Sequence, residues 1–150
     1  MIIDLDEILT MWKKDSVIDQ FQLDETTMNI AKLHGKYLEL FSITKLQIKK
    51  AEYSLDDMLK NKWEWYNGRM DKDTIDSLGW QYDPFEGCAK PLKGDMERYY
   101  KADKDIQKIK AKIDYLITVK ETLDEIIGTL RWRHSAIKNI IDFRKFESGM

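Results

Sequence analysis

The sequence has 150 residues, a length at which one compact domain is expected. Apolar residues make up 43% and charged residues 35% of it, and both prolines fall within residues 84–91. This composition favours helices with one apolar face over an all-β fold, which needs turn residues throughout. The net charge of −2 favours no partner, but residues 1–30 are acidic and residues 131–145 basic. That asymmetry permits complementary packing within or between subunits, or an anionic partner for the basic parts.

Three absences bound the cellular setting. No apolar run approaches the roughly 20 residues of a membrane span. The N-terminal residues Met1 to Asp4 lack the basic start and apolar centre of a signal peptide. The single cysteine, Cys88, cannot form an internal disulfide and fits a reducing compartment. We therefore expect a soluble cytoplasmic protein without a membrane partner.

Hydrophobic periodicity predicts two helices in the first half of the chain. The first is short, over residues 5–13. The second begins at Asp24, which is placed to cap it, and ends near Tyr66, just before the stop signal Asn67-Gly68. Gly35 and a β-branched pair further along leave open whether this long helix is continuous or broken into two.

The middle of the chain is predicted to be irregular. Residues 67–95 hold most of the glycines and both prolines, with room for a short helix over 73–78. Trp80, Tyr82 and Phe85 indicate that this stretch is packed down rather than a free linker. A third helix, capped by Asp95, is predicted over residues 96–146.

The third helix carries an apolar line at alternating spacings of three and four: Ile106, Ile109, Ile113, Leu116, Leu123, Ile127, Leu130, Ile137 and Ile141. A second apolar line lies beside it. The two lines together are too wide for a two-stranded coiled coil, so they favour a higher-order bundle. The alternative is a helical hairpin core within one chain. His134 interrupts the line as a polar residue that sets register or oligomer state. The predicted self-association residues are Leu123, Ile127, Leu130, His134, Ile137 and Ile141.

The motifs of common enzymes are missing. No glycine-rich phosphate loop and no Gly-x-Ser-x-Gly turn occurs in the sequence. His34 and His134 lie far apart without a cysteine or carboxylate at ligand spacing, and no histidine accompanies Cys88 in its loop. We expect a protein that is not an enzyme and binds no metal or cofactor.

The most suggestive stretch is residues 60–69, at the predicted end of the second helix. It packs three cations and three aromatic residues into ten positions: Lys60, Lys62, Trp63, Trp65, Tyr66 and Arg69. Single-stranded nucleic acid is held by such sets, because cations track phosphates and flat rings stack on bases. The alternative is that the aromatic residues are core and the lysines are merely solvated. Trp63 and Tyr66 share a helix face and Trp65 points elsewhere, so one set is predicted to be core.

Four motifs follow one another in order along nearly the whole chain. Lys13-Lys14-Asp15 is followed by Ile18-Asp19, and the Lys60–Arg69 pattern comes next. Ala102-Asp103-Lys104-Asp105 is the third. The fourth and most specific is the C-terminal pattern that runs from Ala136-Ile137-Lys138 through Phe146-Glu147 to Gly149. Through these four motifs the chain resembles the UvsY family of recombination mediators of T-even-like bacteriophages.

The resemblance implies a helical ring of about six or seven subunits that binds single-stranded DNA and has no catalytic activity. Such a ring helps to load the phage recombinase onto DNA covered by the single-strand-binding protein, inside the host cell. The family's DNA-contacting basic pair matches Lys60 and Lys62, with lysine where arginine is expected at the second position. Arg69, Trp63 and Tyr66 complete the predicted DNA-binding set. The rival reading is a coiled-coil scaffold or adaptor that binds no DNA.

Together these elements predict an all-α fold. A long helix pair is joined by an irregular middle loop, a short helix precedes it, and the C-terminal helix forms an oligomeric helical bundle. Residues 1–95 are predicted to be the DNA-binding region with its loop, and residues 96–150 the oligomerisation helix, within one structural unit.

Overall fold

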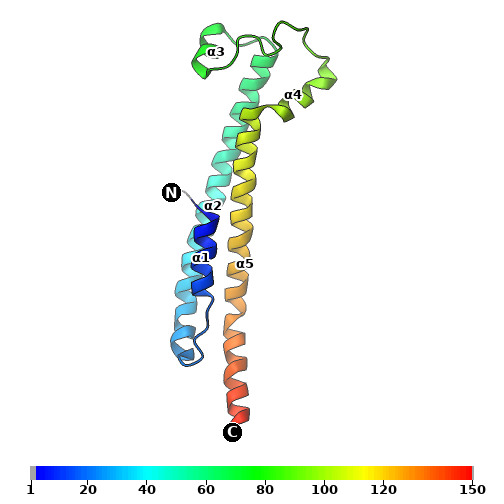
Figure 1. Cartoon of the computed structure of the whole chain (residues 1–150). Helices are drawn as coiled ribbons and strands as arrows, with labels where there is room; N and C mark the ends of the chain where they lie inside the picture. The colour runs from blue at the N-terminus through cyan, green and yellow to red at the C-terminus, as the bar shows by residue number, and fades with distance from the viewer. Residues whose placement is uncertain (1–2, 150) are drawn as a thin grey trace. The chain divides into compact units, whose positions relative to one another are not determined.

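The computed structural model describes residues 3–149, and within that range the regular structure is entirely helical. Five α-helices and one turn of 3-10 helix (Lys93–Asp95) follow in order (Figure 1): α1 Leu5–Asp15, α2 Leu23–Tyr66, α3 Lys72–Leu78, α4 Met96–Ala102 and α5 Lys104–Glu147. The predicted all-α class is confirmed. No helix in this range has the length and hydrophobicity to cross a membrane.

The chain forms two compact units. Unit 1 comprises residues 1–47 and 116–150, and unit 2 comprises residues 48–115. The expected boundary at residue 95 differs from this division. Each of the long helices α2 and α5 contributes one part to unit 1 and another part to unit 2. The outermost residues of the expected ranges, Met1, Ile2 and Met150, lie outside the described residues.

Unit 1 is built from α1, the first part of α2 and the last part of α5. Its core joins all three helices through Ile8, Tyr37, Val119, Leu123 and Leu130. In α1, the Asp4 carboxylate accepts the backbone N–H of Asp6 at 2.8 Å, which supplies one of the partners that a helix start lacks. Burial of one apolar stripe from each helix therefore holds this unit together.

Most of the α5 residues predicted to join subunits lie inside unit 1 instead. Leu123, Ile127, Leu130 and Ile137 are all buried in the single chain. This corrects the prediction that these four residues form the contact between subunits, because they have no free surface to offer a second copy. For them the intrachain alternative describes the structure. His134 and Ile141, from the same predicted set, are exposed.

Arg133, rather than His134, faces the interior of unit 1. Its guanidinium donates to the carbonyls of Asp15, Ser16 and Val17 at 2.9, 3.2 and 2.8 Å. These carbonyls follow the end of α1, so the side chain serves as a cap from another helix. Burial lowers the pKa of Arg133 below its ordinary value, and the Asp15 carboxylate opposes that effect.

Two open points about the long helices are decided. The second helix is continuous from Leu23 to Tyr66, with Asp24 in its first turn rather than at its cap. The third predicted helix is wrong as a single element, because the chain is extended at Asp103 (φ −67°, ψ 125°) and divides it into α4 and α5. Asp95, at the start of α4, makes no side-chain capping bond.

Candidate nucleic-acid interface

The end of α2 is shaped by the Asn67-Gly68 signal. Gly68 adopts a left-handed conformation (φ 69°), which glycine enters without the steric cost that a Cβ imposes. Its N–H donates to the carbonyl of Trp65 at 3.2 Å, and the N–H of Arg69 donates to that of Glu64 at 2.8 Å. This paired arrangement closes the helix and turns the chain back along its last turn.

That turn brings two of the predicted DNA-binding residues together at the surface. The Arg69 guanidinium carbon lies 5.0 Å from the ring centroid of Trp63, within cation–π distance. Trp63 is 44% exposed and Arg69 is exposed. Lys60, one helical turn earlier, has a side chain that is 75% exposed and lies 3.9 Å from Glu64. These three side chains form an accessible cationic and aromatic surface, which we call the Trp63 face.

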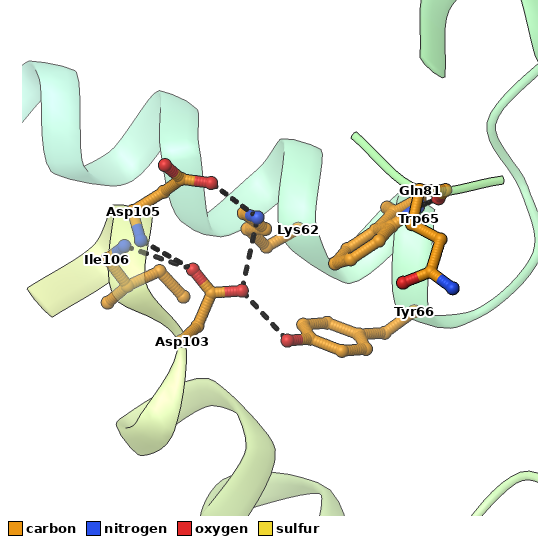
Figure 2. Close-up of polar contacts among 7 residues, drawn as sticks. All are labelled: Lys62, Trp65, Tyr66, Gln81, Asp103, Asp105 and Ile106. Carbon is orange, nitrogen blue, oxygen red and sulfur yellow. Dashed lines mark hydrogen bonds and ion pairs between the residues drawn. The ribbon is translucent and has the colours of Figure 1, made fainter. Parts of the chain in front are cut away.

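Lys62 does not belong to that face, which corrects its prediction as a phosphate contact. Its side chain is only 3% exposed, and its Nζ lies 3.1 Å from Asp103 Oδ2 and 2.7 Å from Asp105 Oδ2 (Figure 2). The same ammonium lies 3.9 Å from the ring centroid of Trp80. A lysine buried between two carboxylates and an indole ring is out of reach of a phosphate, so Lys62 is a structural residue of unit 2.

Asp103, the partner of Lys62, also caps the start of α5, which it directly precedes. Its Oδ1 accepts the backbone N–H groups of Asp105 and Ile106 at 3.0 and 3.1 Å. Its Oδ2 accepts the Tyr66 hydroxyl at 2.8 Å in addition to the lysine (Figure 2). Burial acts to raise the pKa of Asp103, but the hydrogen bonds from Tyr66, Ile106 and Lys62 outweigh it and hold that pKa below its ordinary value.

Tyr66 is likewise buried and is corrected as a stacking candidate. It is 8% exposed, and its ring packs edge-on against Tyr100 with centroids 5.4 Å apart. Burial, followed by the hydrogen bond to Asp103, raises the pKa of the Tyr66 hydroxyl above its ordinary range. Of the two aromatic residues predicted to share a face, only Trp63 reaches the surface.

The middle stretch is packed down as predicted at Trp80 and Phe85, whereas Tyr82 is 65% exposed. Trp65 donates its indole N–H to the carbonyl of Gln81 at 2.8 Å, and its ring lies 5.3 Å from that of Trp80. Phe85 packs on Tyr66 at 5.8 Å between centroids. These contacts hold the loop against the end of α2 and shield Lys62 from solvent.

Sequence reasoning overlooked one exposed aromatic residue beside the Trp63 face. Tyr53 is 68% exposed in α2, and it continues the face toward Lys49 at spacings of three, four and seven residues. The helical phase of the Lys60–Arg69 motif is the signal that identifies it. Lys49 is paired with Glu52 at 3.3 Å, so this end of the face is close to neutral.

Within residues 3–149, no group of three or more His, Cys, Asp or Glu side chains is arranged to hold a metal ion.

Comparison with known proteins gives a match over nearly the whole chain. The sequence profile of the UvsY family, described as recombination, repair and ssDNA binding protein UvsY, matches residues 11–150. The recombination protein uvsY of Enterobacteria phage T4 is 28% identical over 145 residues, covering 97% of this chain and 98% of that protein.

Solved structures agree with the sequence match. The crystal structure of the bacteriophage T4 recombination mediator protein UvsY in lattice type II superposes with a TM-score of 0.83 at 26% identity, covering 98% of this chain and 99% of that one. The lattice type I structure gives a TM-score of 0.79 at 28% identity, covering 97% and 99%.

Proposed function

The chain belongs to the UvsY family of recombination, repair and ssDNA-binding proteins, and on that premise we propose that it is an oligomeric recombination mediator. It binds single-stranded DNA and promotes loading of a phage recombinase onto DNA covered by the single-strand-binding protein. The observation that carries the proposal is the Trp63 face, which presents a ring and two cations at the surface of a chain from this family.

Each residue of the Trp63 face has a distinct part in holding the strand. Lys60 and Arg69 supply point charges for phosphates, and Arg69 also offers a planar group that stacks on Trp63. The exposed indole accepts an unstacked base whatever its identity, so binding is independent of sequence. Lys62 and Tyr66 act indirectly, because they fix the end of α2 that carries the other three residues.

Self-association brings several such faces onto one strand, which raises the overall affinity by avidity. The part of α5 beyond residue 130 exposes candidate contact residues on two sides. His134 and Ile141 are exposed beside the buried Ile137, and Trp132 and Phe143 are exposed on another side of the helix. We propose that these exposed positions, rather than the buried line, join about six or seven copies into a ring.

The work of the mediator is differential binding and involves no bond formation. A strand held along several subunits is withdrawn from the single-strand-binding protein and offered in extended form to the recombinase. The proposed setting is the cytoplasm of the host cell, where phage DNA recombines.

A fluorescence titration tests the proposal, with a labelled oligonucleotide short enough to contact one subunit, so that each substitution removes contacts from a single Trp63 face. Lys60→Ala should weaken binding and make the dependence of log affinity on log salt shallower by about 0.7, the value expected for one lost phosphate contact on a single strand. Trp63→Ala should weaken binding by about 1–3 kcal/mol without changing the salt slope, because stacking releases no counterions. Lys72→Ala, at an exposed lysine of α3, is the matched control.

Absence of binding by the wild-type protein at low salt, with the oligomer intact, would overturn the proposal. The chain would then behave as the scaffold that binds no DNA. A native mass measurement on the same sample reports the number of subunits and tests the ring.

A further inference from the structure

The first turns of α5 carry a row of lysines that lies apart from the Trp63 face. Lys104, Lys108 and Lys112 are exposed and follow one another at spacings of four residues, about 6 Å along the helix axis. All three lie within about 80° around the helix, because four residues turn it by 400°. Ile106, which belongs to the opposite side of the helix, is buried in unit 2. We call Lys104, Lys108 and Lys112 the α5 lysine row.

The positive charge of this row is not compensated within unit 2. Among the ion pairs of the described residues there, none includes a member of the row. Asp105 is the single carboxylate placed three or four residues from any of the three. Its Oδ2 instead lies 2.7 Å from the buried Lys62 ammonium, as Figure 2 shows.

The spacing makes the row unfavourable for the isolated chain. Lys104 and Lys108, and then Lys108 and Lys112, are like charges at i and i+4, an arrangement that destabilises a helix. A polyanion laid along the row relieves both repulsions at once. Lys60 of the Trp63 face and its neighbour Lys49 differ, because each has a glutamate one turn away.

We propose that the α5 lysine row is a second nucleic-acid contact, which binds the phosphate backbone of single-stranded DNA through charge alone. The inference rests on the proposed function and divides the labour within unit 2. The Trp63 face holds bases by stacking, and the lysine row supplies most of the phosphate attraction. The buried Lys62 takes part indirectly, since it draws the Asp105 carboxylate away from the row.

The test compares charge removal at two places on the same helix. The triple variant Lys104→Gln, Lys108→Gln, Lys112→Gln should make the salt slope for a labelled oligonucleotide shallower by about 2, which corresponds to roughly 100-fold weaker binding near 0.1 M salt. Lys108→Gln alone should cost about 5-fold by the same scaling. Lys110→Gln is the matched control: it is exposed, two residues away and on another side of the helix, and should change affinity less than 2-fold.

Thermal unfolding followed by circular dichroism shows whether each variant is folded, so that weaker binding is not mistaken for loss of the fold. The triple variant should unfold at the wild-type temperature or slightly above it, since two like-charge pairs are removed. A folded triple variant with the wild-type salt slope would overturn the inference while leaving the proposed function intact. The row would then face an acidic protein or solvent. Failure of the wild-type protein itself to bind would instead remove the proposed function.

Discussion

Removal of the Lys62 ammonium by the substitution Lys62→Met should destabilise unit 2 and leave the phosphate contacts in place. The methionine keeps the length and apolar stem of the side chain and deletes the charge. Asp103, buried beside it, then loses one of its four hydrogen-bonding partners.

The magnitude follows from burial. Loss of one partner of a buried ion pair costs roughly 3–5 kcal/mol, because the remaining charge is left uncompensated. Asp103 keeps the Tyr66 hydroxyl and two backbone N–H groups, and Asp105 is partly exposed, so the low end of about 3 kcal/mol is expected. For a chain of this size that cost lowers the unfolding temperature by roughly 6–12 °C.

Urea and thermal unfolding measure this cost, with Lys60→Met as the matched control. Lys60 is mostly exposed and its ion pair is long, so its loss should cost less than about 0.5 kcal/mol. The DNA assay should give the opposite pattern at temperatures where both variants are folded: Lys60→Met loses about 0.7 of the salt slope, and Lys62→Met loses none. A Lys62→Met protein with wild-type stability and a shallower slope would refute the reasoning, because it would place the ammonium in solvent against a phosphate.

Three further outcomes are expected. Because the pKa of Asp103 is depressed in the folded state, its carboxylate stabilises the fold above the unfolded pKa of about 3.9, and this stabilisation is lost as the pH falls toward the folded pKa. The free energy of unfolding in urea, measured from pH 6 to pH 3, should therefore depend less steeply on pH for Asp103→Asn than for wild type. Arg133→Met should cost about 3 kcal/mol and speed amide hydrogen exchange at the end of α1, and unchanged exchange there would contradict its capping role. Ile137→Asp should unfold unit 1, whereas Phe143→Asp should leave unit 1 folded and dissociate the proposed ring. Circular dichroism reports folding and sedimentation reports the size of the assembly. An intact ring in Phe143→Asp would rule out that side of the helix as the interface.

The helical class, and most helix boundaries, follow from the sequence because they depend on local signals. The Asn67-Gly68 stop marks the end of α2 at Tyr66, where the structure ends it. The same kind of reasoning missed the break at Asp103, because apolar periodicity continues across it from α4 into α5. An aspartate inside a helical pattern is ambiguous until the distant Lys62 and Tyr66 are known to lie against its side chain.

The candidate site shows the same limit more sharply. Residues 60–69 contain the residue types expected in a single-strand binding site, and composition alone makes them candidates. Which of them reach solvent depends on the loop and on α5, both distant in sequence. Lys60, Trp63 and Arg69 are exposed, while Lys62 and Tyr66 are covered by Trp80, Phe85 and Asp103.

The sequence by itself determined the periodicity of the long helices, their end signals and the chemistry available to bind a strand, because each depends on neighbours within a few turns. The tertiary structure decided which side of α5 is core and which cation is buried. After Leu130, helical spacing allows either Arg133 or His134 to face inward. In the structure Arg133 does so, because its guanidinium donates to the carbonyls of Asp15 and Val17. Burial is a property of what packs against a residue, and the carbonyl partners of Arg133 lie more than a hundred residues away in the chain.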